Sequence, residues 1–213
     1  MVSTKIKPML IKISQMGPLS NNGYIVMCPT TKEGVIVDAP AEPEKLLNAL
    51  ERAGTRIKAI IITHSHSDHI AGLEEIRLVT GAPVLAQKDD AMDLTQVDSI
   101  LDDGQTITIG RVSLDAIHTP GHTPGSICLL TAGHILTGDT LFPGGPGATS
   151  TPEQFQRELR SITSKLLVLP EDIVVCPGHG DNTTIGKAKE EYTVFASRKQ
   201  SSALCGNVMW LAS

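Results

Sequence analysis

The sequence has no excess of positive charge and no long apolar run, and both absences exclude classes of function. Its 213 residues carry a formal net charge of −5. No broad basic field is therefore available to attract a phosphate backbone, and we do not expect nucleic acid as a partner. The apolar runs, such as residues 59–62, are far too short to cross a bilayer. Residues 1–13 mix lysines with single hydrophobic residues and do not form the continuous core of an export signal. We therefore expect a cytoplasmic protein with no membrane partner.

Cysteine is scarce and scattered along the chain. Cys28, Cys128, Cys176 and Cys205 form no Cys-x-x-Cys pair. This spacing argues against a disulfide framework and against a thiolate zinc site. We expect four reduced thiols.

The length and the hydrophobic content, 40% of residues, support one sizeable core. No segment has the length or composition of a linker, so we predict a single domain over residues 1–213. The apolar cluster at residues 208–211, which contains Trp210, is expected to pack against the rest of the chain. The same cluster leaves a homo-oligomer open.

Two blocks of short strands alternate with helices. Helices are predicted at residues 42–53, 69–80 and 155–167, with Gly54 ending the first and Thr151 capping the third. Strands are predicted at residues 10–13, 23–27, 35–38, 57–63, 83–86, 106–109, 112–117, 126–130, 135–137 and 173–176. This order predicts an α/β fold of two packed sheets with helices outside.

The strongest functional signal is the run Thr63-His64-Ser65-His66-Ser67-Asp68-His69, which follows the apolar strand and precedes a helix. In an extended loop, residues two apart point the same way, so His64 and His66 can present two imidazoles to one cation. Asp68 and His69 begin the turn into the helix and can face a second cation. Dinuclear hydrolytic sites separate their metals by roughly 3.5–4 Å.

Three later segments offer further ligands. His122 lies in a turn between glycines and prolines, Asp139 follows a predicted strand, and His179 follows another. Each stands beside glycine, which lets the backbone approach a crowded centre. The seven residues together predict a dinuclear metal site.

The pattern H-x-H-x-D-H, then H, then D, then H resembles the metallo-beta-lactamase superfamily over most of the chain. The resemblance implies a four-layer αβ/βα sandwich of two mixed β-sheets with the site along one edge. It implies that the first metal is held by His64, His66 and His122 and the second by Asp68, His69 and His179. In that family Asp139 would bridge the two metals.

Residues 121–126 and 138–142 most resemble the glyoxalase II (hydroxyacylglutathione hydrolase) branch. The sequence departs from glyoxalase II proper, which carries a further C-terminal helical region, and residues 143–149 lack the basic residue found near this point in bacterial relatives. Glutathione is therefore not assigned as the carrier. Substrate identity is expected to depend on the loops at residues 19–22 and 142–151.

The predicted reaction is hydrolysis of a thioester or related ester of a small molecule. Two cations that share a water would lower its pKa from near 15.7 toward roughly 7 and supply hydroxide at neutral pH. We predict Asp68 and Asp139 as the catalytic carboxylates. Two zinc ions are favoured because imidazole dominates the ligands, although iron or manganese would also suit them.

Three other functions remain as alternatives. The first is a persulfide dioxygenase, a class of enzyme that resembles this chain in fold but uses a single iron. The ligands of that iron would be His64, His122 and Asp139. A lactonase or a beta-lactamase would use the same hydrolytic chemistry. A diiron electron-transfer or metal-binding module is the alternative that is not an enzyme.

Several polar residues are interpreted as structural. Asp38 is taken as a strand-end carboxylate, although it could also support the metal loop. His118 and His134 are taken as ordinary strand and turn residues. Residues 144–147 lack the Gly-Lys-Ser/Thr ending of a phosphate-binding loop and are predicted to form a flexible loop on the substrate side.

Overall fold

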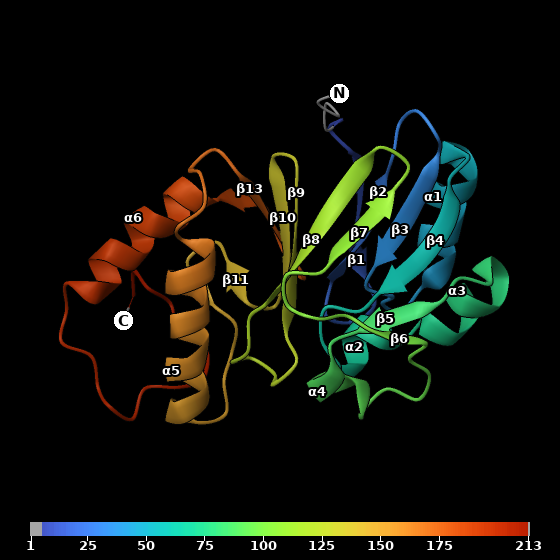
Figure 1. Cartoon of the computed structure of the whole chain (residues 1–213). Coiled ribbons are helices and arrows are strands. Elements are labelled where there is room, and N and C mark those ends of the chain that lie inside the picture. The colour runs from blue at the N-terminus through green and yellow to red at the C-terminus, as the bar shows by residue number, and fades with distance from the viewer. Residues whose placement is uncertain (1–5, 213) are drawn as a thin grey trace.

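Two six-stranded sheets face each other across the centre of the molecule (Figure 1), in a computed structural model that describes residues 6–212. The first sheet is built from the N-terminal half in the order of the sequence. Its strands are β1 (Met9–Met16), β2 (Asn21–Met27), β3 (Glu33–Val37), β4 (Arg56–Ile61), β5 (Val84–Ala86) and β6 (Ser99–Ile100). It is mixed, because β1 to β3 pair antiparallel whereas β3 to β6 pair parallel.

The second sheet has the order β14-β13-β10-β9-β8-β7. Its strands are β7 (Thr106–Ile109), β8 (Val112–His118), β9 (Ile127–Thr131), β10 (His134–Gly138), β13 (Val174–Pro177) and β14 (Thr183–Thr184). The pair β10 and β13 is parallel and the other pairs are antiparallel. A small hairpin joins β11 (Leu141–Phe142) to β12 (Gly145–Pro146).

Helices cover the outer faces of both sheets. Figure 1 shows α1 and α3 beside the first sheet and α5 and α6 beside the second. The helices are α1 (Pro43–Ala53), α2 (Ser67–Ile70), α3 (Leu73–Thr80), α4 (Lys88–Ala91), α5 (Pro152–Ser161), a π-helical turn (Ile162–Leu166) and α6 (Ile185–Ala196). Among the described residues, no helix has both the length and the apolarity needed to cross a membrane. The four-layer αβ/βα prediction is confirmed.

The layers follow from the two-residue period of the strands. In β3, Val35 and Val37 point into the space between the sheets, whereas Ile36 points to the helices outside. In β4 the same alternation places Ala59 and Ile61 inside and Ile60 outside. Both faces of β4 are buried over residues 59–61, as the continuous apolar run predicts for a parallel strand covered on two sides.

Two predicted helices differ from the observed ones. The helix expected at residues 69–80 is interrupted, because Gly72 packs so closely on the segment after β3 that a Cβ there would overlap Pro40 O. The Gly72 N–H donates to Ala39 O and the Ala39 N–H donates to His69 O, so the break joins α2 to the first sheet. The helix expected at residues 155–167 begins at Pro152 behind the predicted cap Thr151, which forms a capping box with Gln154, but it changes to a π-helical turn at Ile162.

Helix α6 was not predicted, although its N-terminus has a local signal. Thr184 caps it by accepting a hydrogen bond from the Lys187 N–H. Four of its residues, Ile185, Ala188, Glu191 and Phe195, are buried. This set includes a glutamate, so the apolar periodicity that marks an amphipathic helix is weak here.

The C-terminal tail packs into the core outside the second sheet, as predicted. Trp210 is 0% exposed, and its ring meets the Tyr192 ring at a centroid distance of 5.4 Å. The backbone N–H of Trp210 donates to Gly144 O, which ties the tail to the hairpin of β11 and β12. Trp210 is thus part of the chain's own interior and offers no surface for a subunit contact.

Replacing Trp210 by alanine should lower the free energy of unfolding by roughly 3–5 kcal/mol, because the large ring leaves a cavity that its neighbours cannot fill. Urea denaturation measures the change. Leu211→Ala is the control, since Leu211 is 51% exposed and its truncation should change stability by no more than about 0.5 kcal/mol. Equal effects of the two substitutions would show that the tail is not packed as described.

Candidate metal centre

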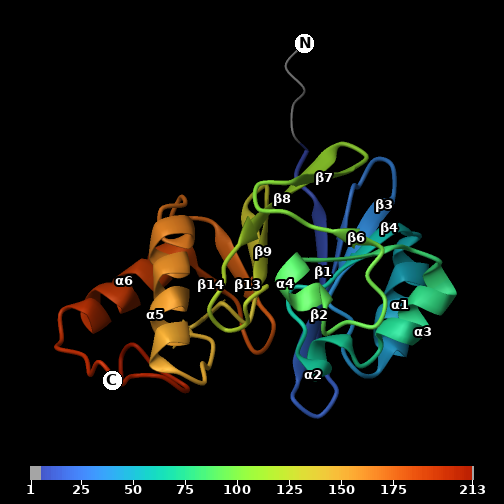
Figure 2. The ribbon, with the colours of Figure 1, turned by 60° about the horizontal axis from the view of Figure 1, so that its bottom comes forward.

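The predicted ligands meet at one edge of the sandwich, which Figure 2 turns toward the viewer together with α2 and α4. The His64 loop leaves the end of β4 and enters α2. His122 lies in the loop between β8 and β9, Asp139 follows β10, and His179 follows β13. Strands β10 and β13 are parallel neighbours, so their carboxyl ends place Asp139 and His179 at the same edge.

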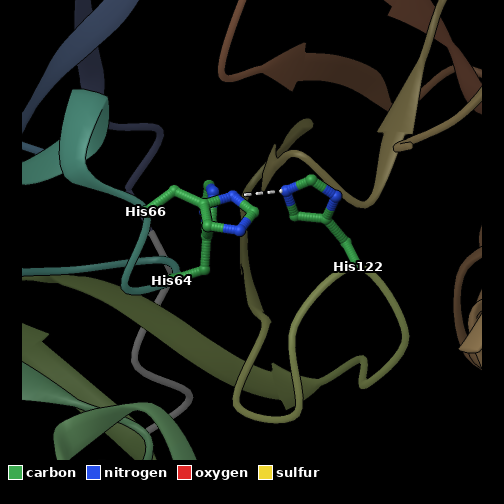
Figure 3. A group of neighbouring side chains, drawn as sticks. All are labelled: His64, His66 and His122. Carbon is green, nitrogen blue, oxygen red and sulfur yellow. Dashed lines mark hydrogen bonds between the residues drawn. The ribbon is translucent and has the colours of Figure 1, made fainter. Parts of the chain in front are cut away.

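Three imidazoles form the first cluster. Figure 3 shows His64 and His66 on one loop and His122 opposite them on another. One ligand atom from each residue lies within 4.8 Å of the other two. The nearest pair is His122 Nε2 and His66 Nδ1, which are 2.9 Å apart. The structure therefore brings together three residues that are up to 58 positions apart in the sequence (122 − 64).

The second cluster consists of Asp68, His69 and His179, whose ligand atoms also lie within 4.8 Å of one another. The Nε2 atoms of His69 and His179 are 3.3 Å apart. Asp68 Oδ2 lies 3.3 Å from His179 Nε2 and 3.5 Å from His69 Nε2. Like the first cluster, it combines residues from both halves of the chain.

Asp139 lies between the clusters. Its Oδ1 is 3.3 Å from His69 Nε2, and its Oδ2 is 3.4 Å from His179 Nε2 and 3.7 Å from His122 Nε2. One carboxylate thus faces imidazoles of both groups. All seven residues predicted from the sequence are brought together here.

Hydrogen bonds fix the direction of three imidazoles. The Nδ1 atoms of His69, His122 and His179 lie 2.8–3.0 Å from Asp38 Oδ2, Ala148 O and Leu19 O, respectively. Because these oxygens are acceptors, we assign the ring proton to Nδ1 in each case. The Nε2 atoms of the three rings then face the centre.

His64 and Asp139 show that this ligand set fits metal ions. Thr63 Oγ1 donates to Asp38 Oδ2 and lies 3.1 Å from His64 Nδ1, so the hydroxyl oxygen can accept the His64 ring proton. His64 Nε2 and Asp139 Oδ1 are both buried, and among the described residues neither has a partner in hydrogen-bond geometry. Buried acceptors without donors are costly, and a divalent cation would satisfy both.

Burial and neighbouring charge set opposite pKa shifts within the centre. Burial lowers the pKa of His64 well below its usual value and also lowers that of His122. Burial opposes protonation of His69 too, but the Asp38 and Asp139 carboxylates outweigh it and raise the pKa of His69 to about 10. Burial likewise disfavours the charged form of Asp139, yet the neighbouring His179 and His69 imidazoles hold its pKa well below the usual range. The Asp139 carboxylate is therefore ionised and able to neutralise positive charge.

Asp38 does more than end a strand, which corrects the structural interpretation of this residue. Its side chain is 2% exposed and binds His69 through Oδ2. It also accepts hydrogen bonds from the Thr63 N–H and the Thr63 hydroxyl. Asp38 thus holds one predicted ligand directly and His64 through Thr63.

Asn21 is a residue of the centre that the sequence did not single out. It is 1% exposed, and its Nδ2 donates to Asp68 Oδ2 over 2.6 Å. Backbone pairing between Asn21 and His179 brings β2 to the ligand loops. Residues 19–22 were expected near the substrate, but nothing in their local pattern marks an amide that orients a carboxylate 47 positions away.

The segment 144–147 is packed against the centre and is not an open loop. Gly145 and Pro146 form β12, and residues 145–147 are buried. A Cβ at Gly147 would overlap Asp139 O and lie 2.9 Å from His122 Nδ1, so only glycine fits. His118 and His134 lie outside the clusters, as predicted; His118 Nε2 faces Pro124 O.

Comparison with known proteins places this geometry in one family. Residues 16–179 match the profile of the metallo-beta-lactamase superfamily. The hydroxyacylglutathione hydrolase GloC of Haemophilus influenzae is 30% identical over 78% of this chain and 89% of its own length. A hydroxyacylglutathione hydrolase of Cereibacter sphaeroides is 37% identical over 75% of this chain. The alignment spans 62% of that longer relative.

Solved structures share the same architecture. BLEG-1, a B3 metallo-beta-lactamase, aligns with a TM-score of 0.76 and 29% identity over 85% of this chain and 97% of its own. The protein TTHA1623, solved in a di-iron-bound form, aligns with a TM-score of 0.69 and 27% identity over 84% of this chain and 96% of its own.

One buried carboxyl group near the centre is not among the predicted ligands. Glu158 of α5 is 0% exposed, and among the described residues neither of its carboxylate oxygens has a partner in hydrogen-bond geometry. It packs against Gly121, where a Cβ would overlap the Glu158 backbone. Burial raises the pKa of Glu158 to about 9, although the nearby Gly147 N–H favours the charged form. Glu158 is therefore a neutral acid at pH 7.

Glutamate at position 158 should make the stability of the metal-free protein depend on pH. Because the pKa of Glu158 is higher in the folded state than in the unfolded state, its contribution to the free energy of unfolding is fully present below the unfolded pKa of 4.5. This contribution is lost as the pH rises toward 9. Glu158→Gln should therefore gain stability over the wild type across this range, by at most roughly 1.4 kcal/mol per pH unit. Urea denaturation at several pH values measures the difference.

The replacement Glu153→Gln, at an exposed position of the same helix, controls for the loss of a charged side chain from α5. A stability difference between Glu158→Gln and the wild type that stays constant from pH 5 to pH 9 would contradict the assignment of a neutral acid.

Proposed function

The chain belongs to the metallo-beta-lactamase superfamily, and from this premise we propose that it is a dinuclear metal-dependent hydrolase of small-molecule thioesters or related esters. The observation that carries the proposal is the convergence of five imidazoles and two carboxylates at one edge of the sandwich. Since three Nδ1 atoms face protein acceptors, the metal-binding nitrogens are directed inward before any cation arrives.

The ligands divide between two positions. His64, His66 and His122 would hold one cation, and Asp68, His69 and His179 would hold the other. Asp139 would contact both, because its two oxygens face different imidazoles. The orphaned His64 Nε2 and Asp139 Oδ1 support this assignment.

When bound, a pair of divalent cations supplies water activated at neutral pH and polarises a carbonyl oxygen. The side chains of the protein would orient that reaction. Asp68 is the more exposed of the two carboxylates, with a side chain 21% exposed against 12% for Asp139. Asn21 holds Asp68 through Oδ2, which leaves Oδ1 to accept a hydrogen bond from the attacking water. Asp139, ionised and nearly buried, would stabilise the positive charge of the centre.

A thioester is the substrate class that we favour. The relatives named hydroxyacylglutathione hydrolases support it, and a thiolate is a good leaving group that suits zinc. Two segments expected to contact the substrate lie beside His179. Leu19 is 63% exposed while its carbonyl faces His179 Nδ1, and the Phe142 ring lies 6.4 Å from the His179 ring. These apolar groups would contact the acyl part of the substrate.

Zinc is our proposal for the metal, because five of the seven ligands are imidazoles. The di-iron form of TTHA1623 supports iron as the other candidate. We also propose one domain, since both sheets contribute to a single core between them. A cytoplasmic location stays a prediction.

Elemental analysis of the purified protein should find about two equivalents of a transition metal, and a chelator should abolish hydrolysis of thioesters. Re-addition of zinc or iron should restore the activity. The panel should contain hydroxyacyl thioesters of glutathione and of other thiols, together with lactones and a persulfide. Full hydrolysis after complete metal removal would refute the proposal, and oxygen uptake with the persulfide alone would favour the dioxygenase.

Replacing His122 by alanine should lower kcat/KM by about 100-fold or more. The substitution removes a ligand of the metal ion that would stabilise charge in the transition state. His134→Ala is the control, since His134 lies at the start of β10 and belongs to neither cluster. Steady-state kinetics on metal-loaded proteins measure both. Equal activity of the two variants would contradict the role of His122.

A further inference from the structure

Asp90 is a buried carboxylate of α4 that is not one of the seven ligands. It is 1% exposed, and three donors surround it. Oδ2 accepts hydrogen bonds from the Ser65 N–H and from the Thr123 hydroxyl, each over 2.8 Å. Oδ1 accepts from the Gly125 N–H over 2.7 Å. Both oxygens are therefore committed to binding protein groups.

The donors come from the two loops that carry the first cluster. Ser65 stands between His64 and His66, and Thr123 follows His122 directly. One loop continues from β4 of the first sheet, whereas the other connects β8 and β9 of the second. Asp90 thus links the two sheets at the point where His66 and His122 approach within 2.9 Å (Figure 3).

The fit around Asp90 is close. A Cβ at Gly125 would lie 2.6 Å from both Asp90 N and Asp90 Oδ1, so the His122 loop rests directly on α4. Thr123 is held a second time, because its N–H donates to Ser126 Oγ and its hydroxyl lies 2.7 Å from the same atom. Asp90 therefore holds the His122 loop in place through direct hydrogen bonds to Thr123 and Gly125.

Asp38 and Asp90 support different parts of the centre. Asp38 binds the His69 ring itself and reaches His64 through Thr63. Asp90 binds the backbone and hydroxyl groups beside His64, His66 and His122. A buried carboxylate holds the N–H and hydroxyl groups that donate to it, because a buried donor without an acceptor costs free energy.

We propose that Asp90 is the positioning residue of the His64, His66 and His122 subset: it sets the spacing between His66 and His122 and thereby the affinity of this subset for a divalent cation. The inference rests on the proposed dinuclear function. The inference adds Asp90 as a residue that affects one of the two metal positions by holding the backbone of the loops that carry its ligands. The effect on catalysis would follow from metal occupancy and not from contact with the substrate.

The substitution Asp90→Asn tests this assignment because the side chain keeps its shape. An asparagine would present an NH2 group to at least one of the three donors, so a hydrogen bond is replaced by a repulsive contact. The affinity of the His64, His66 and His122 subset for Zn²⁺ should fall about 10- to 100-fold. The affinity of the Asp68, His69 and His179 subset should stay within about twofold of the wild type.

Titration with Zn²⁺ against a competing chelator gives the two affinities. Imidazole ¹⁵N chemical shifts, assigned with single histidine variants, show which subset loses its metal. Asp98→Asn is the matched control: Asp98 also accepts a backbone hydrogen bond in the first sheet, from the Val84 N–H over 2.8 Å, and pairs with Arg77 away from the centre. It should leave both affinities unchanged.

Thr123→Val is the second variant and keeps the test decisive if Asp90→Asn does not fold. It removes the contacts of the hydroxyl with Asp90 and Ser126, keeps the backbone bonds of Asp90, and should weaken the same subset by a few-fold. Wild-type affinities in Asp90→Asn, or in Thr123→Val where the former does not fold, would overturn the inference while leaving the proposed function standing. Equal weakening of both subsets would also overturn it. A wild-type protein that binds no metal at all would instead refute the proposed function.

Discussion

Five imidazoles and two carboxylates are crowded together at one edge of the sandwich, where His64 and His69 are almost completely buried. Acceptor atoms this close repel one another unless a cation or a proton stands between them. The His66 and His122 nitrogens, 2.9 Å apart, and the His69 and His179 nitrogens, 3.3 Å apart, illustrate this conflict. The surrounding structure has to hold these groups against their repulsion, and much of its architecture can be understood from that requirement.

Each sheet supplies part of the centre, so the packing of the two sheets is also the assembly of the site. The His64 loop extends from the first sheet, while His122, Asp139 and His179 extend from the second. The apolar residues between the sheets fix the distance between these loops to the accuracy of close packing. Polar contacts across the same gap, such as the Ile127 N–H to Thr63 O hydrogen bond of 2.9 Å, then align the loops. The packing of the hydrophobic core thereby sets the geometry of the polar centre.

The groups that support the ligands are almost completely buried. Asp38, Asn21 and Asp90 are each no more than 2% exposed, and each binds a ligand or its loop. Such support orients the ligand side chains toward the centre before a metal binds, which lets a site act without rearrangement. The family membership of the chain agrees with this arrangement, since hydroxyacylglutathione hydrolases are similar to it in sequence and a B3 metallo-beta-lactamase is similar to it in fold.

The sequence by itself determined most of the strands, helices α1 and α5, and the seven candidate ligands. These rest on local patterns: alternation within a strand, helical spacing, and histidines or a carboxylate directly after a strand. Only the tertiary structure decided the break at Gly72, the helix α6 and the roles of Asp38, Asn21 and Asp90. Each of these depends on partners far away in the chain, as when Asp90 meets Gly125 across 35 positions. A hydrogen bond between distant residues leaves no periodic trace in the sequence, because its geometry exists only once both sheets are packed.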